Sequence, residues 1–226
     1  PVVRRIRSLA FRAAEPLVAE DPRLPARLHR LAQADPEAFG RFECAVLALF
    51  PEIERIDVEA LETPQARHDG GTTILPYTIK DAVCRLNVKR KGLPCPVDIA
   101  FMSAGARRVI GLLAEAAEAS CARGGAVFAV EAIEAGVHPR LYEGLLDSLV
   151  DILGGAPLLV TSHAPLVIQY LKPERLYVGA PAGDGVARFR RIGAKKLSAF
   201  RRAAGDRGLG FADYLFSLLC DDAYGQ

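Results

Sequence analysis

The sequence predicts an α/β fold in which a parallel sheet is flanked by helices. Two short apolar runs, Ala126–Val130 and Pro157–Thr161, are separated by a stretch of helical length. Continuous apolar runs of about 4–8 residues that alternate with helices are typical of buried parallel strands. A third run, Leu176–Val178, extends the pattern to helix-β-α-β-α-β over residues 99–180, which is typical of a doubly wound sheet.

The first fifty residues predict helices. Their apolar residues have helical spacing on two faces, Ile6, Leu9, Ala10 and Ala13 on one and Leu24, Leu28 and Leu31 on the other. Asp21-Pro22 and Asp35-Pro36 predict helix starts, because Asp caps a helix and Pro suits its first position. A third short helix is expected over Phe42–Phe50 and ends before Pro51.

Residues 51–98 predict a small β meander. Ile53–Leu61 alternates imperfectly between polar and apolar residues, and Thr72–Thr78 and Ala82–Lys89 are further strand candidates. Turns are expected at His68–Gly71 and Arg90–Gly92. We therefore divide the chain into a helical segment (1–50), a β insert (51–98) and an α/β lobe (99–226).

The lobe contains three predicted helices between its strands. The first runs from the Met102–Gly105 segment to about Arg123, the second from Pro139 to Leu153, and a short third covers Pro165–Leu171. The glycine pair after Leu153 is typical of a helix end. The tail Phe211–Leu219 predicts an apolar helix whose packing partner the sequence does not identify.

Composition excludes several classes of protein. The 226 residues carry a net charge of only +2 and no apolar segment near the roughly 20 residues that a membrane span needs. The first residues lack the apolar core of a signal peptide. Five cysteines form an odd, scattered set without Cys-x-x-Cys spacing, which argues against a disulfide scaffold or a zinc knuckle. We expect a protein of the reducing cytoplasm with no membrane partner.

Polar residues follow the two buried runs, at the position where doubly wound sheets bind their ligands. Glu131 follows the first run, and Ser162 and His163 come directly after the second. Upstream, Ser103 and Gly105 begin the predicted helix, whose free backbone N–H groups and positive dipole end suit an anion. An acid, a serine-histidine pair and an anion-binding helix start could surround a metal-bound phosphate.

The order of these segments resembles the C-terminal half of an ABC-type ATPase head of the RecF/SMC/OLD-like branch, often labelled AAA-type predicted ATPases. Met102–Ala106 is similar to the signature motif, usually Leu-Ser-Gly-Gly-Gln or Leu-Ser-Ser-Gly-Thr, and Val127–Glu131 resembles the Walker B strand with its acid. Glu134–Pro139 resembles the Glu-Asn-Gly-Leu-His-Pro D-loop, and Thr161–Pro165 resembles Thr-Thr-His-Ser-Pro with the switch histidine. Phe50–Ile53 is typical of the insert before the signature.

The resemblance covers roughly residues 40–180 and implies an ATPase lobe with ATP and Mg²⁺ as ligands. Glu131 would hold the water shell of Mg²⁺, and His163 would contact the γ-phosphate or the attacking water. The expected ATP-binding residues are Ser103, Ala104, Gly105, Ala106 and Glu134, and the signature residues would cap ATP bound on the opposite subunit. Such heads form dimers, so a homo-oligomer is expected.

Two departures from the family pattern matter. Ala132 stands where the family has its general-base Glu, and a methyl group cannot accept a proton, so hydrolysis should be slower by about two or more orders of magnitude. An engineered substitution and a naturally inactive ATPase both account for Ala132. The G-x-x-x-x-G-K-[ST] motif is also missing from the sequence, so the Walker A half is expected on another chain or in residues outside these 226.

Three functions remain open from the sequence. The first is the ATPase lobe, which the resemblance places in DNA repair or anti-phage defence, with a nuclease partner. The second is a catalytically inactive module for dimerisation or scaffolding. The third is a metal-dependent nuclease using Glu131, Glu134 and His163, which lacks the further carboxylates of two-metal catalysis.

The stretch Arg188–Arg207 holds eight Arg or Lys residues and one acid, Asp206. It predicts either a solvated basic helix or a contact with the DNA backbone or an acidic partner. Phe189 and Phe200 interrupt the basic residues but are too few to predict base stacking.

Overall fold

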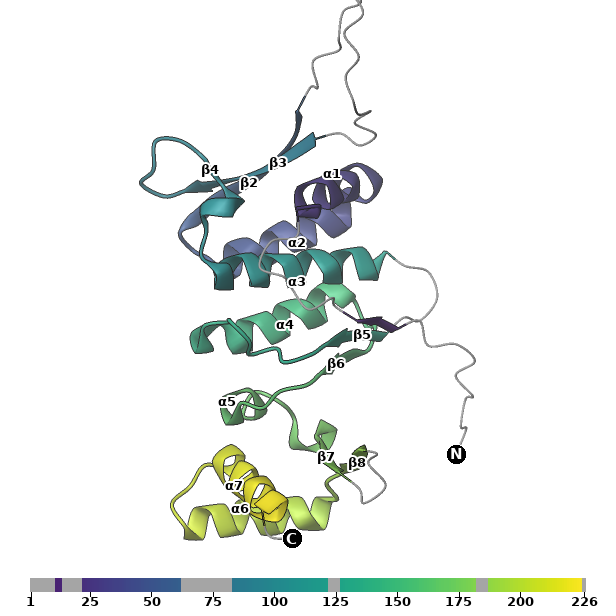
Figure 1. Cartoon of the computed structure of the whole chain (residues 1–226), viewed down its shortest axis with the longest axis vertical. Helices are drawn as coiled ribbons and strands as arrows, with labels where there is room; N and C mark the ends of the chain where they lie inside the picture. Colours follow the sequence, from purple (N-terminus) through teal and green to yellow (C-terminus); the bar gives the residue numbers. More distant parts are fainter. Residues whose placement is uncertain (1–10, 14–21, 62–82, 122–126, 182–186, 225–226) are drawn as a thin grey trace, which may run out of the picture. The chain divides into compact units, whose positions relative to one another are not determined.

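The computed structural model describes residues 11–13, 22–61, 83–121, 127–181 and 187–224 (Figure 1). These residues form two compact units. The N-terminal unit contains the described residues up to Glu131 together with Ala135–Val160, and the C-terminal unit contains Ala132–Glu134 and the chain from Thr161 onward. None of the described helices is both long and apolar enough to cross a membrane.

The N-terminal unit combines helices with two small sheets. Its elements are β1 (Phe11–Ala13), α1 (Leu24–Ala34), α2 (Pro36–Leu49), β2 (Ile53–Leu61), β3 (Val83–Arg90), β4 (Val97–Asp98), η1 (Ile99–Phe101), α3 (Ala104–Ser120), β5 (Val127–Val130), η2 (Pro139–Leu141), α4 (Tyr142–Leu153) and β6 (Leu158–Val160). Helices α2, α3 and α4 lie between the antiparallel sheet β2-β3-β4 and the parallel sheet β1-β5-β6 (Figure 1). Described residues of the predicted helical segment (1–50) and of the predicted β insert (51–98) therefore pack in the same unit as α3 and α4.

The parallel sheet confirms the two main strand predictions. β5 and β6 are parallel neighbours, with Val130 opposite Val160, so both strands leave the sheet at the same edge. The prediction of a helix that includes Ala13 is wrong, because Phe11–Ala13 forms β1, which pairs in parallel with the other edge of β5. Three residues are too few to show a strand period, and the hydrogen bonds come from a partner more than a hundred residues away in sequence. Ile6, Leu9 and Ala10 lie outside the described residues.

Helices α1 and α2 follow the predicted pattern with shifted ends. Asp35 caps α2, because its Oδ1 accepts the backbone N–H of Ala38 at 3.0 Å. α2 is continuous from Pro36, so the separate helix predicted over Phe42–Phe50 is wrong. α1 begins at Leu24 and not at Asp21-Pro22, and its predicted apolar residues Leu24, Leu28 and Leu31 are buried.

An ion pair between Arg27 and Glu118 joins α1 to α3. The Arg27 guanidinium donates to both Glu118 carboxylate oxygens, at 2.9 and 2.8 Å, and both side chains are only 18% exposed. Two parallel hydrogen bonds in this partly buried setting fix the angle between the helices more firmly than an exposed pair would.

The β insert is a three-stranded antiparallel sheet. β2 and β3 confirm the strands expected at Ile53–Leu61 and Ala82–Lys89, and Gly92 makes the turn after β3 with a φ of +79°. The third strand is β4, a two-residue strand that pairs with β3 and that the sequence did not predict. The strand expected at Thr72–Thr78 and the turn at His68–Gly71 lie outside the described residues.

The C-terminal unit is a β hairpin packed with helices. Its elements are α5 (Pro165–Ile168), η3 (Pro173–Arg175), β7 (Tyr177–Pro181), β8 (Ala187–Arg191), α6 (Ala194–Asp206) and α7 (Phe211–Tyr224). The predicted third parallel strand is wrong, because β7 pairs antiparallel with β8 in a sheet of its own. A three-residue apolar run identifies a strand but not its partner.

The apolar tail has its packing partners in the same unit. α7 buries Leu215 in a cluster with Leu176, Ile192 and Leu197. The basic stretch is not one helix, because Arg188–Arg191 lies in β8 and the rest belongs mainly to α6. The hairpin and the helix therefore present these cations on two different elements.

Candidate functional site

The start of α3 is a capped helix terminus. Ser103 is the N-cap, and its Oγ accepts the backbone N–H of Ala106 at 3.2 Å. Ala104 and Gly105 complete the first turn, where Ser103 and Ala104 are exposed and Ala106 is buried. The turn thus presents its backbone N–H groups and the positive end of the helix dipole.

Gly105 brings this turn against the loop after β5. A Cβ atom at position 105 would lie 2.5 Å from the carbonyl oxygen of Gly136, which is closer than carbon and oxygen approach in proteins. Only glycine allows the two backbones to touch here, and Gly136 itself has a φ of +69°. The signature-like and D-loop-like segments are therefore in direct backbone contact, although Gly105 and Gly136 are 31 positions apart in sequence.

A pocket of about 700 Å³ opens beside this contact, within the N-terminal unit. Three segments that the sequence marks as candidates line it, together with Arg90, Arg140 and Leu141. These segments contribute Phe50 and Glu52 of the insert, Phe101, Met102, Ser103, Gly105 and Ala106 around the helix start, and Gly136, Val137 and His138 of the D-loop-like segment. Two arginines against one glutamate give the lining a net positive charge. The pocket therefore suits an anionic ligand or an anionic partner group.

His138 has a structural role at the rim of this pocket. Its Nδ1 accepts the backbone N–H of Arg140 at 3.2 Å, so the imidazole caps η2. Arg90 and Arg140 are the lining residues that sequence reasoning missed. Arg90 lies in the insert, far from the motifs in sequence, and no local pattern marks either arginine.

Glu131 lies at the end of β5 with an exposed side chain. Its backbone carbonyl accepts a long hydrogen bond, 3.5 Å, from the Arg108 guanidinium of α3. The link joins the strand end to the helix that begins at Ser103, while the carboxylate stays open to solvent. An exposed carboxylate at a strand end fits the expected role of holding the water shell of Mg²⁺.

Ala132 has an unusual backbone. Its φ is +47°, the left-handed region that costs an L-residue about 1–2 kcal/mol. The Ala132 N–H donates to Thr161 Oγ1 at 3.0 Å, and the Ile133 N–H donates to the Thr161 carbonyl at 3.1 Å. These two bonds hold the turn within the C-terminal unit, and no carboxylate is present at the position expected for a general base.

Glu134 anchors the segment that carries His163. Glu134 Oε1 accepts the His163 backbone N–H at 2.8 Å, while Oε2 is buried and has no hydrogen-bond partner in the described part of the chain. Burial acts to raise the pKa of Glu134, but the hydrogen bonds from the His163 backbone and the Ser162 hydroxyl outweigh it and lower the pKa below its ordinary value.

The structure thus gives Glu134 a direct contact with the switch-like segment. The ATP contact that the resemblance implied for Glu134 stays a prediction. His163 itself is exposed, so its ring is open to solvent, and the adjacent Ser162 Oγ accepts the Ala164 N–H at 3.0 Å. Among the described residues, no group of three His, Cys, Asp or Glu side chains could hold a metal ion, so the nuclease hypothesis gains no support.

The fold is that of SMC ATPase heads. The chain is similar to a structure described for ATP-driven dimerization and DNA-stimulated activation of SMC ATPases, with a TM-score of 0.50, 12% identity, and coverage of 78% of this chain and 96% of that one. It is also similar to an Smc head bound to the C-terminal winged-helix domain of ScpA, with a TM-score of 0.52, 12% identity, and coverage of 76% and 47%.

A third similar structure is a Pyrococcus furiosus Smc head with an extended coiled coil, bound to the C-terminal domain of ScpA. Its TM-score is 0.50 at 13% identity, with coverage of 78% of this chain and 39% of that chain. The chain spans less than half the length of these two ScpA-bound heads. No protein-family model matches the sequence, and no curated protein matches it.

Proposed function

We propose that this chain is the signature- and switch-bearing part of an SMC-like ATPase head. It would complete an ATP site at a dimer interface, together with a Walker A segment that lies outside the 226 residues. The observation that carries the proposal is the pocket in which the Ser103 helix start, the Gly136 loop and the insert meet.

Electrostatics support a polyphosphate as the ligand of this pocket. The first turn of α3 offers backbone N–H groups besides the Ala106 N–H that Ser103 caps, and it has the positive end of the helix dipole. Arg90 and Arg140 add two cations. A triphosphate carries several negative charges, so the helix start would cap the phosphate end of a nucleotide held by the opposite subunit. Glu131 would hold the water shell of Mg²⁺, which neutralises charge on the phosphates.

Ala132 sets the expected kinetic behaviour. Without a carboxylate to orient or deprotonate water, the site would bind ATP and hydrolyse it slowly. Nucleotide would then act as a stable link between two heads. DNA repair or anti-phage defence with a nuclease partner is the process we propose, in line with the DNA-stimulated activation described for one similar SMC ATPase.

The test measures ATP-dependent dimerisation of the protein combined with its Walker A segment, by light scattering after size exclusion with Mg²⁺-ATP. Ser103→Arg should abolish the dimer, because a long cation would fill the pocket mouth and displace the phosphate. Ser198→Arg is the matched control, since Ser198 is an exposed serine of α6. Dimerisation of Ser103→Arg at the wild-type ATP concentration would refute the proposal.

A scaffold without nucleotide is the second candidate, and Ala132 is the observation that favours it. Ala132→Glu distinguishes the two, because a restored general base should raise ATP hydrolysis by about 10²–10⁴-fold in an intact ATP site. No gain in hydrolysis, together with nucleotide-independent dimerisation, would favour the scaffold.

A further inference from the structure

We propose that the β7-β8 hairpin and the first turn of α6 form a binding surface for single-stranded nucleic acid. The proposal concerns the C-terminal unit alone and does not depend on the ATP site. It rests on two exposed aromatic rings and the cations around them.

The pairing register separates the hairpin into two faces. Tyr177 lies opposite Arg191, and Gly179 lies opposite Phe189, so these four residues share one face. The other face carries Val178, which packs on the buried cluster that includes Leu176 and Ile192. Only the Val178 face of the hairpin packs on the core of the C-terminal unit. The opposite face, which we call the aromatic face, carries Tyr177 and Phe189 and points away from this core.

Both rings on the aromatic face are open to solvent. The exposed fraction is 63% for Tyr177 and 67% for Phe189. A Cβ atom at Gly179 would lie 2.6 Å from the Phe189 ring, so the ring extends across the strand at the position that lacks a side chain. One side of the Phe189 ring covers the Gly179 backbone, and most of the ring surface remains exposed to solvent.

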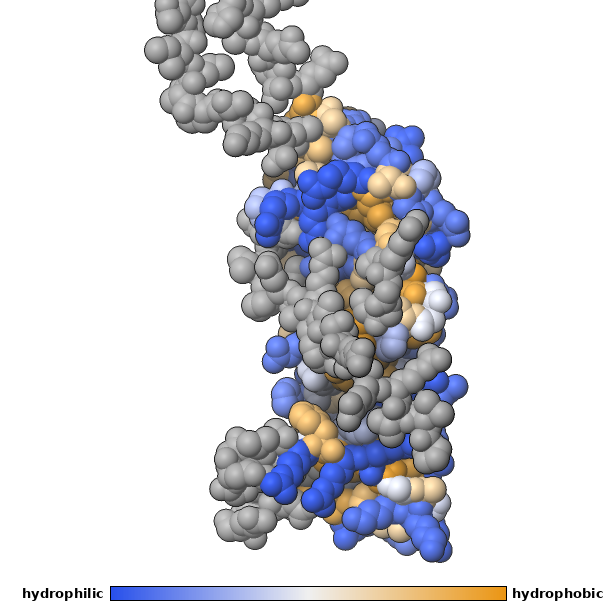
Figure 2. Space-filling model, turned by 90° about the vertical axis from the view of Figure 1, so that its right-hand side faces the viewer, coloured by the Kyte–Doolittle hydropathy of each residue, from blue (hydrophilic) through white to orange (hydrophobic). Residues whose placement is uncertain are grey.

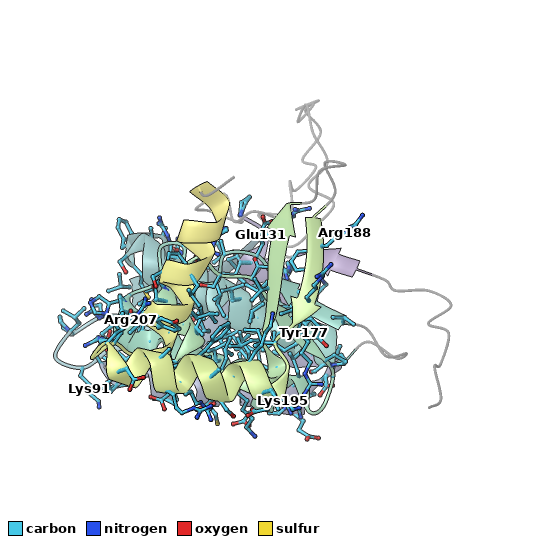
Figure 3. The ribbon with its side chains drawn as sticks, turned by 90° about the horizontal axis from the view of Figure 1, so that it is seen from below. Lys91, Glu131, Tyr177, Arg188, Lys195 and Arg207 are labelled. Atoms are coloured by element: carbon cyan, nitrogen blue, oxygen red, sulfur yellow. The ribbon has the colours of Figure 1, made fainter. Side chains whose placement is uncertain are left out.

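Cations lie on and next to this face. Arg191 shares the face with the two rings, and Lys195 and Lys196 are exposed on the first turn of α6, four and five residues after the hairpin ends. Arg188 and Arg190 are also exposed on β8, but they lie opposite Ala180 and Val178 and therefore belong to the other face. Figure 3 shows Tyr177 at the end of the hairpin beside α6, Arg188 near its other end, and Lys195 on α6. Figure 2 shows hydrophobic side chains, in orange, between strongly hydrophilic ones on the surface of this part of the chain.

Acidic residues are scarce in this stretch. From Leu176 to Arg207 the sequence contains only Asp184 and Asp206, and both lysines lie at the positive end of the α6 dipole, where stability alone favours acids. Such a surface is complementary to a polyanion. A partner with both negative charge and flat apolar faces fits it best.

A single strand of nucleic acid has both features. Its phosphates would pair with Arg191 and the two lysines, and its unpaired bases would stack on Tyr177 and Phe189. A duplex keeps its base faces stacked on one another, so it could use only the cations. Neither contact reads the sugar 2′-hydroxyl, and we therefore expect DNA and RNA strands to bind alike.

The experiment measures fluorescence anisotropy of the full chain, without ATP, with a labelled 20-nucleotide dT strand, a U strand and a 20-base-pair duplex. The two single strands should bind within a few-fold of each other and more tightly than the duplex. Phe189→Leu keeps an apolar cover on Gly179 and removes the flat ring, and Tyr177→Leu does the same on the neighbouring strand. Each should weaken single-strand binding about 5- to 100-fold and leave duplex binding nearly unchanged.

Tyr170→Leu is the matched control, because Tyr170 is an exposed aromatic of the same unit, 39% exposed, outside the hairpin. Circular dichroism verifies that each variant is folded. Arg191→Gln should lower the dependence of log Kd on log salt by about 0.7, the share of one phosphate contact on a single strand. Wild-type binding by Phe189→Leu and Tyr177→Leu, or equal affinity for the duplex, would overturn the proposal. Tighter binding to phosphatidylserine vesicles than to the dT strand would do so too, and would identify the surface as a lipid contact.

Discussion

Gly105→Ala is the sharpest test of how the N-terminal unit builds its pocket. The added methyl group would lie 2.5 Å from the Gly136 carbonyl oxygen, whereas carbon and oxygen ordinarily approach no closer than about 3.3 Å. The start of α3 and the Gly136 loop would have to separate by about 0.8 Å. Both partners are backbone, so no side-chain rotation can relieve the overlap.

The magnitude follows from two opposing effects. Overpacking of this kind costs about 1–3 kcal/mol, while alanine in place of glycine within a helix gains about 0.5–1 kcal/mol. The net loss in free energy of unfolding should be about 0–2.5 kcal/mol, which for a chain of this size lowers the Tm by up to about 10 °C. Urea unfolding followed by circular dichroism measures the first quantity, and a thermal scan measures the second.

Gly40→Ala is the matched control. Gly40 lies inside α2, and a Cβ atom there would meet nothing within 4 Å. The same substitution should therefore stabilise the protein by about 0.5–1 kcal/mol at position 40. If Gly105→Ala is as stable as Gly40→Ala, the backbone contact between α3 and the Gly136 loop is not present in solution, and the pocket beside that contact is not formed as described.

Three further substitutions test the rest of the structure. Ala132→Gly should raise the free energy of unfolding by up to about 1 kcal/mol, because glycine adopts the left-handed φ without strain; a loss in denaturant titration would contradict that conformation. Glu134→Gln should be less stable than wild type at neutral pH. The lowered pKa of Glu134 means that the charged form stabilises the fold above its ordinary value of 4.5, so the difference should shrink as pH falls below 4.5; a difference that does not depend on pH would exclude this cause. Phe42→Ala should cost about 3–5 kcal/mol, because Phe42 is fully buried; a cost below 1 kcal/mol in the same titration would mean that α2 does not pack as described.

The positions of strands and helices could largely be predicted where a sequence feature within the same segment specifies them. The apolar runs that became β5 and β6 and the Asp35 cap of α2 are short-range features, and the structure has them where the sequence predicts them. The motif order also predicted the fold class, which the similarity to SMC heads supports. The strand β1 was missed because its partner β5 is more than a hundred residues away. β4 was missed because two residues are too few to show a strand period, and for β7 the strand was predicted but its antiparallel pairing with β8 was not.

The candidate site shows the same division. Ser103, Glu131 and His163 could be chosen from sequence because each follows a strand or begins a helix, although their chemical roles are still untested. The contact of Glu134 with the His163 backbone and the pocket arginines could not be chosen, because each depends on segments separated by about thirty residues or more.

The sequence alone determined the helices and strands whose hydrogen bonds or apolar spacing lie within one segment. It also showed that position 132 carries an alanine and no carboxylate. Only the tertiary structure decided which strands pair, which loops line the pocket and which face of the β7-β8 hairpin remains uncovered. The physical reason is that helix periodicity and capping act over a few residues, whereas strand pairing and close backbone contacts join residues that the sequence order does not bring together.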